Sequence, residues 1–141
     1  MKISRSAQRD TAFILLFEYI VKGDETAEEI WENAVEIPNL KELPYVKQLF
    51  FGCTEHKSEI DMIVDKSLVG WKSERVSFVS RAILTLAAFE MIRIEDIPYK
   101  VSIDEAIKLS KKYEAGKAYK FINGVLNAVA DDLGLKVAED E

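Results

Sequence analysis

Apolar residues recur at steps of three and four along nearly the whole chain, which is the spacing of one face of an α-helix. No run of valine, isoleucine and threonine alternating with polar residues is long enough to indicate a strand. The pattern therefore predicts an all-α fold, a compact bundle of six to seven helices in one domain. Six of them can be bounded by residue, at about 3–22, 25–36, 45–70, 74–94, 102–116 and 117–133.

Residues that favour helix ends support these bounds. Ser4 is a candidate N-cap for the first helix, and Gly23 is its expected stop. Ser102 and Glu105 have the spacing of a capping box, in which each side chain accepts a hydrogen bond from the backbone amide of the other residue. We expect an N-terminal helical layer over about 3–70, a C-terminal layer over about 73–134, and a frayed acidic tail at 136–141.

The segment from Ala82 to Ile94 is apolar around most of its circumference, so its helix is expected at the centre of the protein. Glu90 interrupts this segment. A buried carboxylate can be a catalytic acid, but Arg93 lies three residues further along the same helix, and Arg81 is also available. We therefore expect Glu90 to have a structural role in an ion pair with one of these arginines.

The composition is that of an ordinary globular domain. With 141 residues, 48% of them hydrophobic, the chain can bury a core without disulfides. The single cysteine, Cys53, lies among apolar neighbours and is expected in that core, because a reactive pair with His56 would lack an orienting third group. No stretch resembles a signal peptide or reaches the length of a membrane span, so we expect a cytoplasmic protein without a membrane partner.

Signatures of catalysis and of cofactor binding are missing from the sequence. A helical di-iron site needs two histidines and the chain has one, and no glycine-rich loop for phosphate or dinucleotide is present. We therefore expect no enzyme activity, no catalytic residue, no metal and no cofactor.

The charge is distributed unevenly along the chain. The formal net charge is -6, but residues 1–22 carry four cations against two anions, and residues 100–120 carry six against three. A polyanion responds to the local field of such a patch rather than to the sum. In the second segment, Lys117-Ala118-Tyr119-Lys120-Phe121 interleaves cations with aromatic rings, which can neutralise phosphates and stack on unpaired bases. This pattern is typical of a site for single-stranded RNA.

Two further features of the C-terminal third are open to more than one explanation. Lys108, Lys111 and Lys112 share one helical face, which serves solubility more often than binding. Gly124 lies within helical periodicity, where glycine costs about 1 kcal/mol relative to alanine, and this indicates close approach of another helix or of a ligand backbone.

We expect the two basic segments to converge in one groove for a phosphate backbone, formed by Lys2, Arg5, Arg9, Lys117, Lys120 and Phe121.

Four motifs follow one another between residues 3 and 133. In chain order they are Arg5-x-x-x-Arg9-x-x-Ala12, Arg81-Ala82-Ile83-Leu84 with Phe89-Glu90, Ile97-Pro98-Tyr99-Lys100-Val101-Ser102-Ile103-Asp104-Glu105-Ala106-Ile107-Lys108-Leu109, and Lys120-Phe121-Ile122-Asn123-Gly124-Val125-Leu126-Asn127. In this order and spacing the chain resembles the NusB family of transcription antitermination factors. The resemblance implies a two-layer helical bundle without catalytic activity.

The resemblance also implies partners. Members of this family bind the boxA element of nascent ribosomal RNA transcripts together with NusE, a small-subunit ribosomal protein, in the antitermination complex of RNA polymerase. By resemblance, RNA contacts fall at Arg5 and Arg9 and between Lys117 and Phe121, and partner contacts near Phe17. Self-association into a homodimer is a further expectation.

One departure from the family pattern concerns the N-terminus. Family members often carry consecutive arginines there, whereas Ser6, Ala7 and Gln8 separate Arg5 from Arg9 in this chain. Fewer phosphate contacts predict weaker binding to free RNA and more dependence on the protein partner. Two alternatives to an antitermination factor stay open, namely the NusB-like domain of a ribosomal RNA methyltransferase and a helical scaffold that binds only proteins.

Overall fold

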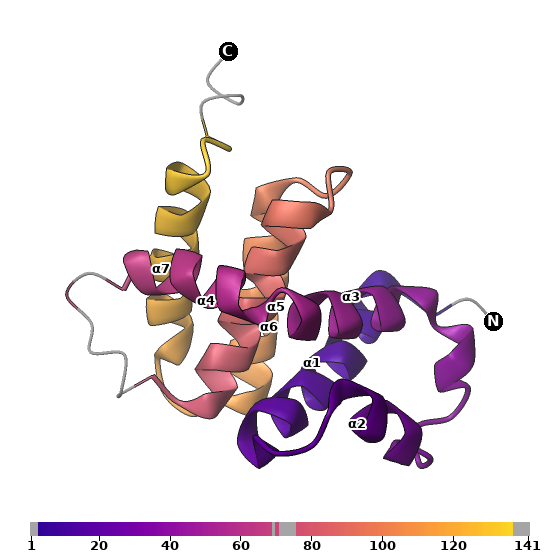
Figure 1. Ribbon diagram of the computed structural model, residues 1–141. Coiled ribbons are helices and arrows are strands. Elements are labelled where there is room, and N and C mark those ends of the chain that lie inside the picture. The colour runs from indigo at the N-terminus through magenta and orange to yellow at the C-terminus, as the bar shows by residue number, and fades with distance from the viewer. Residues whose placement is uncertain (1–2, 69, 71–75, 137–141) are drawn as a thin grey trace.

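The structure is a computed structural model that describes residues 3–68, 70 and 76–136. Over these residues the chain forms helices and no strand (Figure 1), which confirms the all-α prediction. The elements are α1 (Arg5–Lys22), α2 (Ala27–Asn33), the short 3-10 helix η1 (Leu40–Glu42), α3 (Pro44–Glu55), α4 (Lys57–Lys66), α5 (Phe78–Arg93), α6 (Tyr99–Tyr113) and α7 (Ala118–Asp132). None of the described helices is long and apolar enough to cross a membrane.

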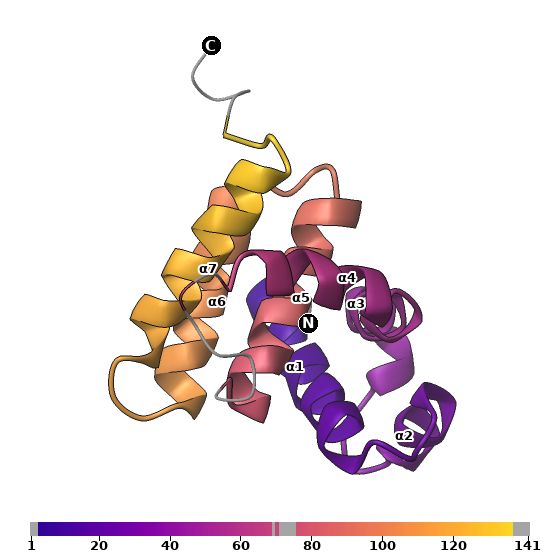
Figure 2. The ribbon, with the colours of Figure 1, turned by 60° about the vertical axis from the view of Figure 1, so that its left-hand side comes forward.

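Helix α5 forms the centre of the molecule. Every residue from Ala82 to Met91 is buried, and the helix contacts α1, α3, α4, α6 and α7. Helices α6 and α7 lie on one side of it and α1, α2 and α3 on the other, while α4 continues from α3 and reaches α7 (Figures 1 and 2). The predicted central position of this helix is confirmed, because a helix that is apolar all round needs neighbours on every side.

The predicted ends of the first helix are confirmed. Ser4 Oγ accepts a hydrogen bond from the Ala7 amide at 3.1 Å, and Gly23 has a φ of 71°, the left-handed conformation that terminates a helix. Helix α2 begins later than the predicted residue 25, because Thr26 and Glu29 form a capping box at its start. At the starts of both α1 and α2, a side-chain oxygen therefore accepts a hydrogen bond from a backbone amide that has no partner within the helix.

The segment predicted as one helix over 45–70 is two helices. The break is at His56, which has φ -105° and ψ 20°, and which ends α3 and begins α4. Cys53 before the break and Ile60 after it are both buried, so the apolar spacing continues through the change of direction. Periodicity along the chain therefore could not reveal the break.

The predicted capping box at Ser102 and Glu105 is wrong. Helix α6 begins at Tyr99 after Pro98, so Ser102 lies inside the helix, and its hydroxyl donates to Glu90 of α5. Glu105 turns toward α1 instead. Two long-range contacts thus involve the side chains that the local motif would have used.

The predicted start of the helix over 74–94 falls partly outside the described residues, and α5 itself is capped by Ser77.

Helices α3 and α5 approach closely at Gly52. A Cβ at this position would lie 2.2 Å from Cζ of the Phe89 ring, which is itself buried. We expect Gly52→Ala to lower the free energy of unfolding by about 1–3 kcal/mol, because the overpacking outweighs the helix preference of alanine. Urea denaturation followed by circular dichroism measures this difference.

Gly124 provides the matched control for that substitution. It also lies within a helix, but a Cβ there would have nothing within 4 Å. We expect Gly124→Ala to raise the free energy of unfolding by up to about 1 kcal/mol, the ordinary preference of a helix for alanine over glycine. If Gly52→Ala raised stability as Gly124→Ala is expected to, the close contact between α3 and α5 would not exist.

Candidate functional site

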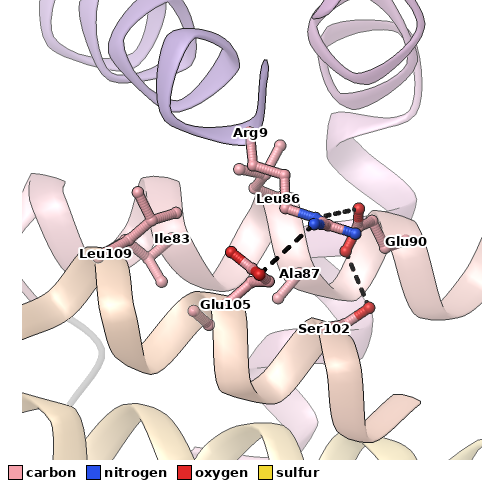
Figure 3. A pocket seen from close by; sticks show the side chains of 9 residues that line it. Arg9, Ile83, Leu86, Ala87, Glu90, Ser102, Glu105 and Leu109 are labelled. Carbon is pink, nitrogen blue, oxygen red and sulfur yellow. Dashed lines mark hydrogen bonds and ion pairs between the residues drawn. The ribbon is translucent and has the colours of Figure 1, made fainter. Parts of the chain in front are cut away.

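A buried cluster of polar side chains joins four helices. Glu90 of α5 is only 1% exposed, and its carboxylate accepts hydrogen bonds from Arg9 of α1 at 2.7 Å and from Ser102 of α6 at 2.9 Å (Figure 3). The Tyr45 hydroxyl of α3 also donates to this carboxylate. The Arg9 guanidinium also lies 3.8 Å from the Glu105 carboxylate, and a cavity of about 10 Å³ lies beside the cluster. Both oxygens of the buried carboxylate have donors, so the fold can hold this charge away from water.

The partner of Glu90 differs from the expected one. Arg93 pairs with Glu59 at 2.8 Å, and Arg81 pairs with Asp65 at 2.9 Å. These two arginines face α4, whereas Glu90 faces α1, α3 and α6. Its expected role in an ion pair therefore holds, but the arginine comes from another helix, a contact that spacing along a single helix cannot indicate.

The two N-terminal arginines lie in different surroundings. Arg9 is 5% exposed and occupied by the ion pair with Glu90, so the structure places it in the core rather than at the expected RNA surface. The Arg5 side chain is half exposed, lies 4.5 Å from the centre of the Tyr45 ring, and is 3.7 Å from Asp96. Lys2 lies outside the described residues. Of the three N-terminal cations predicted to bind RNA, Arg5 is therefore the one that the structure shows with its guanidinium exposed to solvent.

The second basic segment lies at the turn between α6 and α7. Lys117 and Lys120 are exposed, and Phe121 is half-buried and packs against the core. In the last turn of α6, the Lys111 ammonium lies 4.7 Å from the centre of the Tyr119 ring. No side chain caps the start of α7, so its first backbone amides add to the positive field. Cations, a ring and free amides therefore meet at this turn.

Helix α6 separates the two basic segments. Arg5 contacts Asp96 just before the start of α6, whereas Lys117 follows its other end. The helix has 15 residues, or a length of about 22 Å at the usual helical rise. The two predicted segments therefore lie at opposite ends of α6, and the cations follow its length. This surface, the basic strip, comprises Arg5, Lys108, Lys111, Lys112, Lys117 and Lys120.

Contacts between α1 and α6 make the basic strip continuous. Ser6 of α1 donates to Glu105 of α6 at 2.6 Å, and Asp10 of α1 accepts from Lys112 and from the Tyr113 hydroxyl. Partial burial, together with the hydrogen bond to Asp10, raises the pKa of Tyr113, so its hydroxyl remains a donor. The lysines in the middle of the strip are thus partly balanced by carboxylates, while Lys117 and Lys120 have no ion pair among the described residues.

Gly124 lies on the exposed side of α7. Because nothing is within 4 Å of the position of its missing Cβ, packing against another helix does not explain this glycine. Lys120 lies one helical turn before it on the same side. Asn127 donates to the backbone carbonyl and the side-chain oxygen of Asn123, which holds both amides in place on this surface. Of the two explanations offered by the sequence, close approach of another helix finds no support among the described residues.

The predicted partner residue, Phe17, belongs to an apolar face of α1. It is half-buried, and its ring stacks on Phe13 with the centres 6.1 Å apart. Ile14 and Val21, three residues before and four after it, are 45% and 46% exposed. Ile14, Phe17 and Val21 together form the apolar α1 face. The exposure of the two aliphatic residues was not predicted from the sequence, because apolar residues at helical spacing are normally assigned to the core.

Cys53 lies in the core, as the sequence predicts, and its surroundings argue against reactivity. The thiol is fully buried, 3.9 Å from the Thr85 carbonyl, while His56 pairs with Glu59 at the surface. Burial, with a smaller contribution from Glu90, raises the pKa of Cys53 well above its ordinary value. Among the described residues there is also no group of three or more side chains able to hold a metal ion.

This raised pKa predicts a loss of stability in alkali. The folded thiol stays protonated where the unfolded thiol ionises, near pH 8.5, so its contribution is complete below about pH 8.5 and decreases as pH rises above that value. Tyr45, whose pKa is raised by burial and by Glu90, acts in the same direction at higher pH. We expect the thermal midpoint to fall above about pH 8.5, and less steeply for Cys53→Ala. Identical pH profiles would contradict this role of the thiol.

Comparisons with known proteins agree on one family. A family model described as the NusB family matches residues 6–131. The transcription antitermination protein NusB of Bacillus subtilis is 41% identical over 131 residues, which cover 93% of this chain and 98% of that protein. The structure of T. maritima NusB superposes with a TM-score of 0.83 at 35% identity and 93% coverage of both chains. A structure of the antitermination factors NusB and NusE in complex with double-stranded RNA gives a TM-score of 0.79 at 34% identity, covering 91% of this chain and 96% of that one.

Proposed function

This chain belongs to the NusB family, and we propose that it binds boxA-type single-stranded RNA of nascent ribosomal RNA transcripts together with NusE, a small-subunit ribosomal protein. In this role it would act in the cytoplasm, as part of the antitermination complex of RNA polymerase. Its curated relatives are transcription antitermination proteins, so the expectation that the chain is not an enzyme is confirmed. The match extends over 98% of the Bacillus subtilis antitermination protein, which favours antitermination over the methyltransferase alternative.

The observation that carries the RNA proposal is the basic strip along α6. Arg5 at one end and Lys117 and Lys120 at the other would follow a phosphate backbone over a length of about 22 Å, the length of α6. At the α7 end, Lys120 and Gly124 share a face on which a backbone can approach closely. A single strand that extends along the strip would meet cations throughout, with Tyr119 and Phe121 near one end to stack on bases.

The apolar α1 face supports the protein partner. Ile14, Phe17 and Val21 expose apolar surface on the helix that also carries Arg5, so a protein docked there would lie next to the RNA. In the related structure that contains both factors, NusB and NusE are held together with RNA. We place NusE on this face, and a second copy of the chain would compete for the same surface in a homodimer.

The test is RNA binding measured by fluorescence anisotropy with and without NusE. A boxA strand, a scrambled strand of equal composition and a duplex would each be titrated over a range of salt concentrations. We expect the boxA strand to bind best, and NusE to increase its affinity. Equal affinity for boxA and scrambled strands in the presence of NusE would instead favour a scaffold that binds only proteins.

A further inference from the structure

A second surface lies far from the basic strip, between α2 and η1. It is an open cleft of about 500 Å³. Trp31, Val35, Ile37 and Leu40 form its apolar lining, and Glu32 and Glu42 stand at its edge. Figures 1 and 2 show α2 on the opposite side of α1 and α5 from α6 and α7. The two surfaces can therefore be occupied at the same time.

One residue of the apolar lining, Val35, is open to solvent, whereas Trp31 is partly buried. Val35 is 87% exposed, more than any other large hydrophobic residue described. Trp31 stacks on Phe50, with the ring centres 6.2 Å apart, and contacts Phe51 at 5.3 Å, while it also lines the cleft. The ring is thus held by the core and available to a ligand. A rigid aromatic ring beside an exposed aliphatic side chain is the type of anchor site that interfaces use.

The segment that contains the cleft is strongly acidic. Residues 23–43 contain seven acidic residues and one lysine, Lys41, which lies at the edge of the cleft. Within the described part of the chain only Glu25 among these acids forms an ion pair, with Lys22 at 2.8 Å. The other six are exposed, namely Asp24, Glu28, Glu29, Glu32, Glu36 and Glu42. Such a field repels RNA and attracts cations.

We propose that this cleft binds a cationic segment of a protein partner. One aliphatic or aromatic side chain of that segment would insert between Trp31 and Val35, and flanking lysines or arginines would face Glu32 and Glu42. Apolar lining alone would accept many partners, and the surrounding acids select a basic one by charge complementarity. The protein would then hold RNA on one side and a basic protein tail on the other.

The test uses the fluorescence of Trp31 in the full chain, with Trp71→Phe to leave one tryptophan. The probe is a synthetic lysine-glycine peptide with two central leucines, and its control has serines in place of the leucines. We expect the leucine peptide to change the emission and to bind more tightly than the serine peptide. Equal binding of the two would overturn the proposal, because attraction would then be nonspecific.

Charge reversal locates the site. The double variant Glu32→Lys, Glu42→Lys should lower the affinity for the leucine peptide by about tenfold or more. The double variant Asp131→Lys, Asp132→Lys, at exposed positions on α7, changes the net charge equally and should lower this affinity by less than about threefold. Equal weakening by the two pairs would overturn the proposal. RNA affinity of the cleft variant should not fall, so failure here and failure of the RNA proposal are distinguishable.

Discussion

Replacing Arg9 by methionine should lower the free energy of unfolding by about 3–5 kcal/mol, because an unpaired carboxylate would remain in the core. The Arg9 and Glu90 side chains are 6% and 1% exposed, and the Arg9 guanidinium donates a hydrogen bond of 2.7 Å to that carboxylate. Tyr45 and Ser102 would still donate to it, but neither carries a compensating charge. Urea denaturation and the thermal midpoint measure the loss.

Two further variants separate the ion pair from other causes. Arg5→Met removes a half-exposed arginine from the same helix and should cost less than about 1 kcal/mol. The double variant Arg9→Met, Glu90→Leu should recover much of the lost stability, because it removes the buried charge as well as its partner. If Arg9→Met were as stable as Arg5→Met, the buried cluster would not be important for the fold.

This prediction changes how RNA binding can be tested. A double substitution of Arg5 and Arg9 would weaken RNA binding through unfolding even if Arg9 never contacted RNA. Arg5→Met alone leaves the cluster around Glu90 intact and reports on the surface. Sequence spacing made these two residues look equivalent, since both belong to the Arg5-x-x-x-Arg9 motif of one helix, and only the packing of α1 against α5 distinguishes them.

Features encoded along a single helix were predictable from the sequence. The apolar circumference of 82–94 placed α5 at the centre, and Ser4 and Gly23 bounded α1, because burial and capping depend on residues close in sequence. Features that depend on contacts between helices were not. Ser102 and Glu105 satisfied a local capping rule, yet Glu90 and α1 took both side chains.

The candidate site shows the same division. The exposure of Lys117 and Lys120 follows from local pattern and was predicted, whereas the local pattern left two explanations open for Gly124. The pairing of Asp10 with Lys112, which brings α1 against α6, involves residues about a hundred positions apart and left no mark on the spacing. The sequence therefore identified many of the cations but not their arrangement as a strip, nor the exposed Ile14 and Val21 beside it.

Removing the two exposed lysines at the α7 end should weaken RNA binding by about tenfold, since the release of counterions from the RNA decreases with every phosphate that the protein no longer neutralises. In the double variant Lys117→Ala, Lys120→Ala, the slope of log affinity against log salt should shrink by about 1.4, or about 0.7 for each phosphate of a single strand. Fluorescence anisotropy of a boxA strand at several salt concentrations measures both quantities.

The control for this variant is Lys47→Ala with Lys66→Ala, which removes the same charge from exposed positions on α3 and α4. Because these lysines lie outside the basic strip, affinity should change by less than about threefold and the salt slope should stay the same. A tenfold loss without any change of slope would mean that Lys117 and Lys120 act by shaping the turn between α6 and α7. A loss shared equally by both double variants would mean that overall charge, and not the strip along α6, attracts the RNA.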